Sequence, residues 1–229
     1  MRLSIVVPTL DEAAAIEATL AAAQRARAAG AEVIVADGGS RDATRTLAAR
    51  LADRVIQAPR GRAAQMNAGA RAATGDTLLF LHADTLLPHD AHEAVRASIA
   101  QGREWGRFDV SIAGADPMLP VVAFMMNARS RWTAVATGDQ AMFATRAAFE
   151  AVGGFAEIPL MEDVALSKAL ARRSRPACLP HRVVTSGRRW ERAGTLRTIL
   201  LMWRLRLAYA LGADPHRLAR RYDVERHSA

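Results

Sequence analysis

Cysteine and aromatic residues are scarce in this sequence of 229 residues, and each shortage excludes a class of function. Cys178 is the only cysteine, so neither an internal disulfide nor a cysteine metal cluster can form, and a reducing compartment fits. Aromatic residues make up 5% of the chain, and no nucleic-acid-binding motif is recognisable. We therefore expect no nucleic-acid partner and a cytoplasmic location.

Long apolar runs are also missing. The longest uninterrupted one, Pro117 to Met126, is far shorter than the roughly 20 residues that span a bilayer. The apolar run near the start of the sequence, Leu3 to Val7, is too short for the core of a signal peptide. We therefore expect neither a membrane-spanning segment nor a secretion signal.

Acidic residues are outnumbered by basic ones, 23 to 31, which gives a formal net charge of +8. Lys168 is the only lysine, so arginine carries almost all of the positive charge. Arginine favours bidentate contacts with phosphate and carboxylate groups. The balance indicates an anionic partner such as a nucleotide or a membrane surface, although biased genomic base composition would produce the same excess.

The first hundred residues alternate between two patterns. Apolar runs typical of strands cover Leu3–Val7, Glu32–Ala36, Arg54–Gln57 and Thr77–Leu81. Stretches rich in Ala, Leu and Arg between them predict helices over Glu12–Ala29, Arg41–Ala52 and Arg62–Ala73. Asp11 and Ser40 are the expected helix N-caps. Short links between the elements indicate an α/β fold with a mostly parallel sheet.

The pattern becomes less regular after Pro88. Helices are expected over Asp90–Gln101, Met118–Arg131, Met161–Arg173 and Thr195–Leu211. Strands are expected over Gly106–Ile112, Ala141–Thr145 and Val183–Val184. No repeat or low-complexity linker interrupts the chain, so we expect one domain over 1–229. Its regular half covers 1–101, and the half over 102–229 would shape an acceptor pocket.

Three predicted strands end in polar or acidic residues, and in a parallel sheet such ends line one ligand-binding crevice. One of these residues, Asp84, can hold Mg²⁺ or Mn²⁺ against a substrate diphosphate, and His82 can add a nitrogen ligand. The alternative is that Asp84 caps a turn and His82 packs at the strand end.

The first two strand ends and the following helix offer contacts to a nucleotide. Asp37 and the loop over 8–12 can bind a base or ribose, although Asp, Gly and Ser are also ordinary turn residues. Arg62, beside the start of a predicted helix, can contact phosphate or lie in a solvated basic loop.

Later segments offer groups for an acceptor. Asp163 shares a helix face with Leu166 and Leu170, which would direct it toward the crevice as a general base. Acidic residues also favour first helical turns through the helix dipole alone. Asp139 can line an acceptor pocket or belong to a simple turn. Arginines and Trp190 near residue 190 can grip a diphosphate and stack on a sugar, or form a surface patch.

The last predicted helix carries an apolar stripe with arginines around it. The stripe comprises Leu196, Leu200, Trp203, Leu207 and Leu211. Such a stripe can lie on an anionic membrane, here the inner membrane face. We favour packing on the protein's own core or on a second copy in a homodimer, because that is the commoner use of an apolar helix face.

Taken in order, these segments resemble family 2 of the GT-A glycosyltransferases. The matching stretches are VVPTLDE, ADGGSRD, RGRAAQMNAGA, FLHADT, GDQAMF, MEDVAL and RRW. The chain also looks like a small subgroup found near radical-SAM enzymes and linked to arsenosugar formation. The resemblance implies a Rossmann-like three-layer α/β/α sandwich whose nucleotide-binding half is 1–101.

The resemblance also implies an activity, the inverting transfer of a sugar from a nucleotide-diphosphate donor to an acceptor hydroxyl, with Mg²⁺ or Mn²⁺. The acceptor would be a small molecule or a lipid. The nucleotide and phosphate contacts would come from Pro8, Thr9, Glu12, Asp37 and Arg62. Asp84 would be the metal ligand and Asp163 the general base. Arg189 and Trp190 would correspond to the end of the family's Gln-x-x-Arg-Trp motif.

The sequence departs from the family pattern at three positions. His82 replaces the first aspartate of the Asp-x-Asp metal motif, and Gly38 replaces the second residue of an Asp-Asp pair. Ser186 stands at the glutamine of the Gln-x-x-Arg-Trp motif, so a processive polymer synthase is not expected. Two alternatives stay open. One is a sugar nucleotidyltransferase, which would need a glycine-rich loop after the first strand, and the other is a non-catalytic protein that binds nucleotide sugars or a membrane surface.

Overall fold

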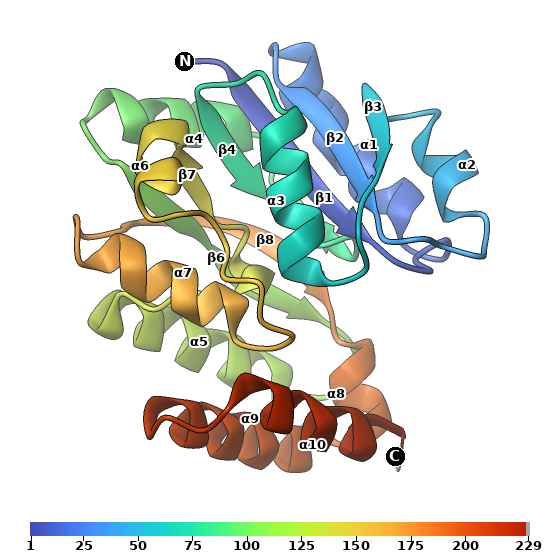
Figure 1. Ribbon diagram of the computed structural model, residues 1–229, viewed down its shortest axis with the longest axis vertical. Coiled ribbons are helices and arrows are strands. Elements are labelled where there is room, and N and C mark those ends of the chain that lie inside the picture. The colour runs from blue at the N-terminus through green and yellow to red at the C-terminus, as the bar shows by residue number, and fades with distance from the viewer. Residues whose placement is uncertain (228–229) are drawn as a thin grey trace.

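The computed structural model describes residues 1–227 and is built on one eight-stranded sheet with helices on both faces (Figure 1). The strands are β1 Leu3–Thr9, β2 Glu32–Asp37, β3 Arg54–Gln57, β4 Thr77–Phe80, β5 Thr85–Leu86, β6 Trp105–Ala113, β7 Phe143–Thr145 and β8 Ala177–Ser186. Their order across the sheet is β3-β2-β1-β4-β7-β6-β8-β5. Only β7 and β5 pair antiparallel to their neighbours, so the predicted mostly parallel sheet is confirmed.

Helices between the strands give the three-layer arrangement, and further helices follow β8. They are α1 Ile16–Ala28, α2 Thr44–Ala48, α3 Arg62–Ala72, α4 Ala91–Ala100, α5 Leu119–Thr133, α6 Arg146–Ala151, α7 Glu162–Ala171, α8 Arg188–Ala193, α9 Thr195–Ala210 and α10 Pro215–His227, with a short 3₁₀ turn η1 at Gly138–Gln140. The helices α1, α4 and α5 contribute to the core on one face, and α3, α6 and α7 to the core on the other.

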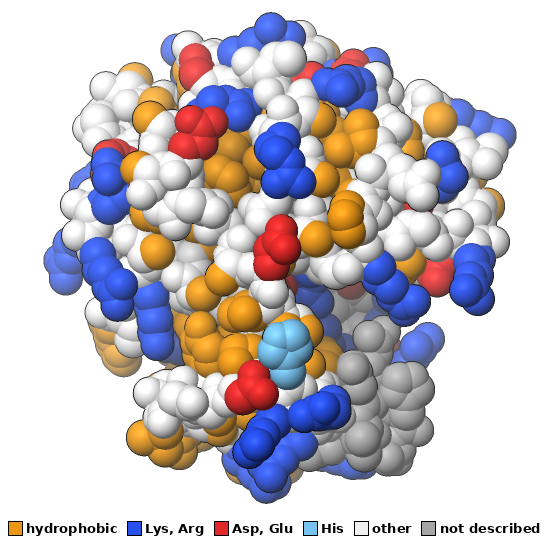
Figure 2. Space-filling model, viewed as in Figure 1, with side chains coloured by type: hydrophobic (Ala, Val, Ile, Leu, Met, Phe, Trp, Pro, Cys, Tyr) orange, Lys and Arg blue, Asp and Glu red, His pale blue; other side chains and the backbone are white. Residues whose placement is uncertain are grey.

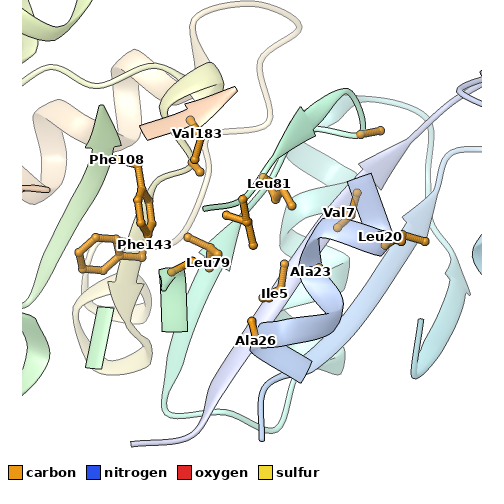
Figure 3. Packing of buried hydrophobic residues seen from close by; sticks show 14 of the residues in the cluster. Ile5, Val7, Leu20, Ala23, Ala26, Leu79, Leu81, Phe108, Phe143 and Val183 are labelled. Carbon is orange, nitrogen blue, oxygen red and sulfur yellow. The ribbon is translucent and has the colours of Figure 1, made fainter. Parts of the chain in front are cut away.

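The two-residue period of the strands divides the core between these faces. Ile5 and Val7 of β1 pack with α1, whereas Val6 between them packs with α3. Figure 3 shows Val7 lying beside Leu20 of α1. The strands β1 and β4 are fully buried, and β2 is buried except for its first residue, Glu32, as expected for parallel strands that are covered on both sides.

The same pairing brings three strand ends to one edge of the sheet. Thr9, at the end of β1, pairs with Asp37 at the end of β2. On the other side of β1, Val6 pairs with Phe80, so the segment that follows β4 also leaves at this edge. The three strand ends that the sequence predicted to lie together therefore do lie together, at the carboxyl edge of these strands.

The second half differs more from its prediction. We expected a two-residue strand at Val183–Val184, but β8 covers Ala177–Ser186 because β6 supplies a long parallel partner. The pairing passes from Phe108–Leu179 to Asp109–Arg182, so Pro180 and His181 bulge out. Three helices, α6, α8 and α10, and the short strand β5 were not predicted.

Both predicted N-caps are wrong. Helix α1 begins after Ala15 and α2 after Ala43, neither with a side-chain cap. Asp11 and Ser40 instead join the loops after β1 and β2. The amide of Asp11 donates to Ser40 Oγ at 2.9 Å, and the amide of Arg41 donates to Asp11 Oδ1 at 2.8 Å. Positive φ at Asp11 fits a loop rather than a cap.

The apolar stripe of α9 does not pack on the protein's own core, contrary to that part of the prediction. Its five side chains are 62–80% exposed. The opposite face of α9, represented by Leu205, packs instead on α7 and α10. Within residues 1–227, no helix combines the length and hydropathy needed to cross a bilayer.

Candidate functional site

Asp37 organises the loop at the end of β2. The side chain is fully buried, and its carboxylate accepts hydrogen bonds from the amides of Gly39 and Ser40, each at 3.0 Å. The hydroxyl groups of Ser40 and Thr9 also donate to it, the latter at 3.3 Å. These contacts fix the loop beside Pro8 and Thr9, and a nucleoside contact by Asp37 stays a prediction.

Gln65 of α3 joins the ends of β1 and β2, a role that the sequence analysis missed. Its Nε2 donates to the carbonyls of Thr9 at 2.6 Å and Ala36 at 2.9 Å. A Cβ added to Gly38 would lie 3.0 Å from the Gln65 amide group. The Gln65 side chain therefore occupies space that a larger residue at 38 would need. Its place in the RGRAAQMNAGA stretch was the available signal.

Arg188 bridges two carboxylates, one in the loop after β1 and one in the segment after β4. Its Nη2 lies 3.2 Å from Oε2 of Glu12 and 3.5 Å from Oδ2 of Asp84. Burial opposes the charged guanidinium, but these two carboxylates raise the pKa of Arg188. The bridge brings the loop after β1 and the segment after β4 together with α8.

His82 faces the turn η1. Its Nδ1 lies 3.3 Å from Oδ1 of Asp139, and its buried Nε2 lies against Gly138, with no hydrogen-bond partner in the described part of the chain. Burial would raise the pKa of Asp139, but the hydrogen bond and charge of His82, with Arg189 and Arg62, lower it well below its usual range. Both ring nitrogens of His82 are thus directed at η1.

Asp163 reaches the same turn from the other side. Its Oδ2 accepts a hydrogen bond from the Gly138 amide at 2.9 Å, while its Oδ1 accepts one from Val164 at 2.7 Å. Leu166 and Leu170 are buried, so the predicted orientation of this helix face is confirmed. Asp163 and His82 also line one small cavity of about 10 Å³, a volume that suits a single water molecule.

Arg62 and Glu162 form an ion pair at the rim of this cavity. Arg62 Nη1 lies 3.0 Å from Oε1 of Glu162, whose side chain is only 2% exposed. Burial, followed by the neighbouring charge of Asp163, raises the pKa of Glu162 despite Arg62. Arg62 therefore places positive charge close to both acidic residues that open α7.

Arg189 and Trp190 already have partners within the protein. The Arg189 guanidinium lies 5.4 Å from the ring centroid of Tyr222 in α10, a cation–π contact. Trp190 is half-buried and packs against the main core. Arg189 still acts on the site, because its charge contributes to the lowered pKa of Asp139. Contacts of these two residues with a substrate stay predictions.

Arg129 of α5 was not singled out from the sequence. Its Nε and Nη2 are buried and donate to no partner among residues 1–222, whose side chains the structure describes. Desolvation lowers the pKa of Arg129, opposed by the charges of Asp163 and Asp139. A buried guanidinium with free donors beside these carboxylates is suited to an anionic group of a ligand.

The described residues do not form a complete metal site by themselves. Among the side chains that the structure describes, those of residues 1–222, no cluster of three or more His, Cys, Asp or Glu is arranged for a metal ion. Asp84, with a 29% exposed side chain, offers carboxylate oxygens of the kind that Mg²⁺ and Mn²⁺ prefer. The arrangement fits a metal whose remaining ligands are substrate phosphates and water.

Comparison with solved structures identifies the fold as GT-A. Staphylococcus aureus TarS 1-349 has a TM-score of 0.66 and 16% identity, over 82% of this chain and 61% of that one. The Pyrobaculum calidifontis mannosyltransferase PcManGT, in complex with GDP-Man and Mn²⁺, has a TM-score of 0.64 and 25% identity, over 90% and 60%. The chain therefore spans about three-fifths of each of these proteins.

A third structure gives the same fold. Glucosyl-3-phosphoglycerate synthase from Mycobacterium tuberculosis, with Mn²⁺, UDP and glucosyl-3-phosphoglycerate, has a TM-score of 0.56 and 19% identity, over 80% of this chain and 70% of that one. No curated protein matches the sequence. The family model of glycosyl transferase family 2 matches residues 4–150. The chain therefore belongs to glycosyl transferase family 2.

Proposed function

We propose that this protein transfers a sugar from a nucleoside-diphosphate sugar to an acceptor hydroxyl, with inversion at the anomeric carbon. The observation that carries the proposal is the meeting of two segments at η1. Asp163 binds the amide of Gly138, and His82, two residues before Asp84, lies against Asp139. Because η1 contacts both the proposed base, Asp163, and the proposed phosphate-binding segment that contains Asp84, one bound donor could reach both.

The nucleoside would bind at the ends of β1 and β2. Pro8 and Thr9 end β1, Asp37 ends β2, and Glu12 lies in the loop after β1. The fixed loops would hold the donor without reorganisation, which helps to orient it for reaction. Family membership and the nucleotide sugars bound by TarS and PcManGT support a nucleotide-sugar donor.

Asp163 would act as the general base and Arg62 would stabilise the departing diphosphate. The Asp163 carboxylate would take the proton of the acceptor hydroxyl as that oxygen attacks the anomeric carbon. The bond from this carbon to the diphosphate would break on the opposite face, and positive charge would favour the leaving group. Asp139 and Arg189 would border the acceptor side, with Trp190 behind them.

Asp84 would hold Mg²⁺ or Mn²⁺, which when bound supplies positive charge to the diphosphate. The Mn²⁺ in two of the similar structures supports the use of a divalent metal. His82 remains a proposed ligand, although its nitrogens are directed at η1 in the structure. Arg188 would have to release Asp84 when a metal binds.

The activity test is the release of nucleoside diphosphate from a panel of UDP- and GDP-sugars, with and without Mn²⁺. Release with at least one donor, and an inverted product anomer by NMR, supports the proposal. Donor binding without release of nucleoside diphosphate from any donor, with or without added acceptors, would favour the non-catalytic binding protein. The Arg188 bridge between Glu12 and Asp84 is the observation that favours this alternative. A hexosyl donor, cytoplasmic location and membership of the arsenosugar-linked subgroup also stay proposals.

A further inference from the structure

The outer face of α9 is apolar and open to solvent. We define it as Leu196, Leu200, Trp203 and Leu207, with Leu211 directly after the helix. Their exposed fractions are 68%, 62%, 65%, 62% and 80%. Scattered exposed apolar residues are ordinary, but a continuous row along one helix marks an interaction surface.

Folding does not require this outer face. The inner face of α9 buries Leu205, which is 3% exposed and packs with Met161 and Val164 at the start of α7. Leu218 of α10 joins the same cluster. The helix is therefore anchored on one side, while the four leucines and one tryptophan on the other side contact little of the described chain.

Arginines border the outer face on both sides. An α-helix turns by about 100° per residue, so residues 196, 200, 203 and 207 fall within about 60° of one another. Arg197 and Arg204 then lie along one border and Arg206 along the other. The helix has three arginines and no acidic residue. An apolar centre with basic borders is the pattern of a helix that lies in a membrane interface.

Helix α5, next to α9, also exposes large apolar side chains. The Thr195 hydroxyl bonds the carboxylate of Asp116 just before α5, and Val135 just after α5 packs with the α9 cluster, so the two helices lie side by side. Phe124 is 69% exposed and Trp132 is 83% exposed. Helix α5 also lacks acidic residues. Figure 2 shows apolar and basic side chains, with acidic and histidine side chains among them, on the lower part of the molecule, where Figure 1 places α5, α9 and α10.

We propose that the outer face of α9 binds the surface of an anionic lipid bilayer. The apolar side chains would enter the interface, Trp203 would lie at headgroup level, and Arg197, Arg204 and Arg206 would contact lipid phosphates. This inference is independent of the proposed sugar transfer.

Charge favours the bilayer over a second copy of the chain. A two-fold interface places the same patch on both partners. Two outer faces would therefore bring arginine borders together without an acidic residue from either α9 helix. Like charges placed together oppose such pairing, whereas anionic headgroups complement the same arginines.

The test is flotation of the full chain with vesicles of phosphatidylglycerol and phosphatidylcholine, compared with phosphatidylcholine alone. We expect binding to the anionic vesicles, weakened by added salt because surface charge is screened. Leu200→Gln with Trp203→Gln should lose this binding. Arg197→Gln with Arg204→Gln should bind roughly 30-fold more weakly, from about fivefold for each arginine near a membrane.

Arg45→Gln with Arg50→Gln is the matched control. It removes the same charge from exposed positions in and just after α2, so it should bind vesicles like the unmodified protein. If this control lost as much vesicle binding as Arg197→Gln with Arg204→Gln, net charge alone would explain the binding, and the proposal would be overturned. Failure of the unmodified protein to float with anionic vesicles would also overturn it. So would a dimer in solution that Leu200→Gln with Trp203→Gln converts to monomer, because a second copy would then cover the face.

Discussion

The carboxylate of Asp163 accepts a hydrogen bond from the backbone amide of Gly138 at 2.9 Å. This bond ties the start of α7 to η1, and η1 in turn contacts His82 after β4. Residues far apart in the sequence thereby form one site.

Replacing Asp163 with Asn should abolish sugar transfer while donor binding stays close to normal. The amide keeps the size of the side chain but cannot take a proton, and loss of a general base costs about 10²–10⁴ in rate. Initial rates of nucleoside diphosphate release and calorimetry with the same donor measure the two effects. Parallel loss of affinity and rate would show that Asp163 binds the donor rather than acting as the base.

Gly138→Ala should damage the site through His82. The new Cβ would lie 2.1 Å from Nε2 of His82, so the imidazole must move. Overpacking of this kind costs about 1–3 kcal/mol of unfolding free energy. Denaturant titration measures this loss, and His82→Ala supplies the control background.

In the His82→Ala background, Gly138→Ala should cost little stability, because the side chain that it would hit is gone. A double-mutant cycle measures this coupling. Equal costs in both backgrounds would mean that the backbone of η1, not His82, makes glycine necessary.

The lowered pKa of Asp139 predicts an acid-sensitive contribution to stability. Its folded-state pKa lies below the unfolded value because His82, Arg189 and Arg62 favour the carboxylate against burial. This contribution is present above the unfolded pKa of about 3.9 and is lost as pH falls toward the folded pKa. Urea unfolding of the protein and of Asp139→Asn should therefore show a difference in unfolding free energy that is constant at higher pH and shrinks as the pH falls below about 5. If the difference in unfolding free energy did not change with pH, the charge of Asp139 would not be the source of its contribution to stability.

Arg129→Met should increase stability and reduce activity. Two buried donors of Arg129 have no partner among the side chains described, those of residues 1–222, so an apolar side chain of similar length removes a desolvation cost. We expect a gain of up to about 1 kcal/mol in unfolding free energy. The matched change Arg131→Met on the same helix should lower the unfolding free energy, because Arg131 Nη2 forms an ion pair with Oδ2 of Asp109 at 2.6 Å. Thermal unfolding compares the two, and destabilisation by both would contradict this account.

The sequence predicted those parts of the site that depend on strand ends and helix periodicity. The ends of β1, β2 and β4 follow from local apolar runs, and the orientation of Asp163 follows from its spacing to Leu166 and Leu170. These features are encoded by neighbours in the chain, so one sequence suffices to find them.

Contacts between distant segments could not be predicted in the same way. Arg188 lies 176 positions from Glu12, and no local pattern indicates that the two meet. From the sequence, Gln65 looks like any polar helix residue. Its role depends on the carbonyl groups of Thr9 and Ala36, which only the folded structure brings beside it. The length of β8 was hidden by Pro180 and His181, which only the pairing with β6 identifies as a bulge.

The central claim is that one donor binds between the strand ends and the start of α7. A crystal structure of the protein with a donor sugar nucleotide and Mn²⁺ tests it most directly. We predict the nucleoside beside Thr9 and Asp37, the diphosphate near Asp84 and Arg62, and the anomeric carbon facing Asp163. A nucleotide bound elsewhere, or an Asp163 carboxylate directed away from the sugar, would contradict the account.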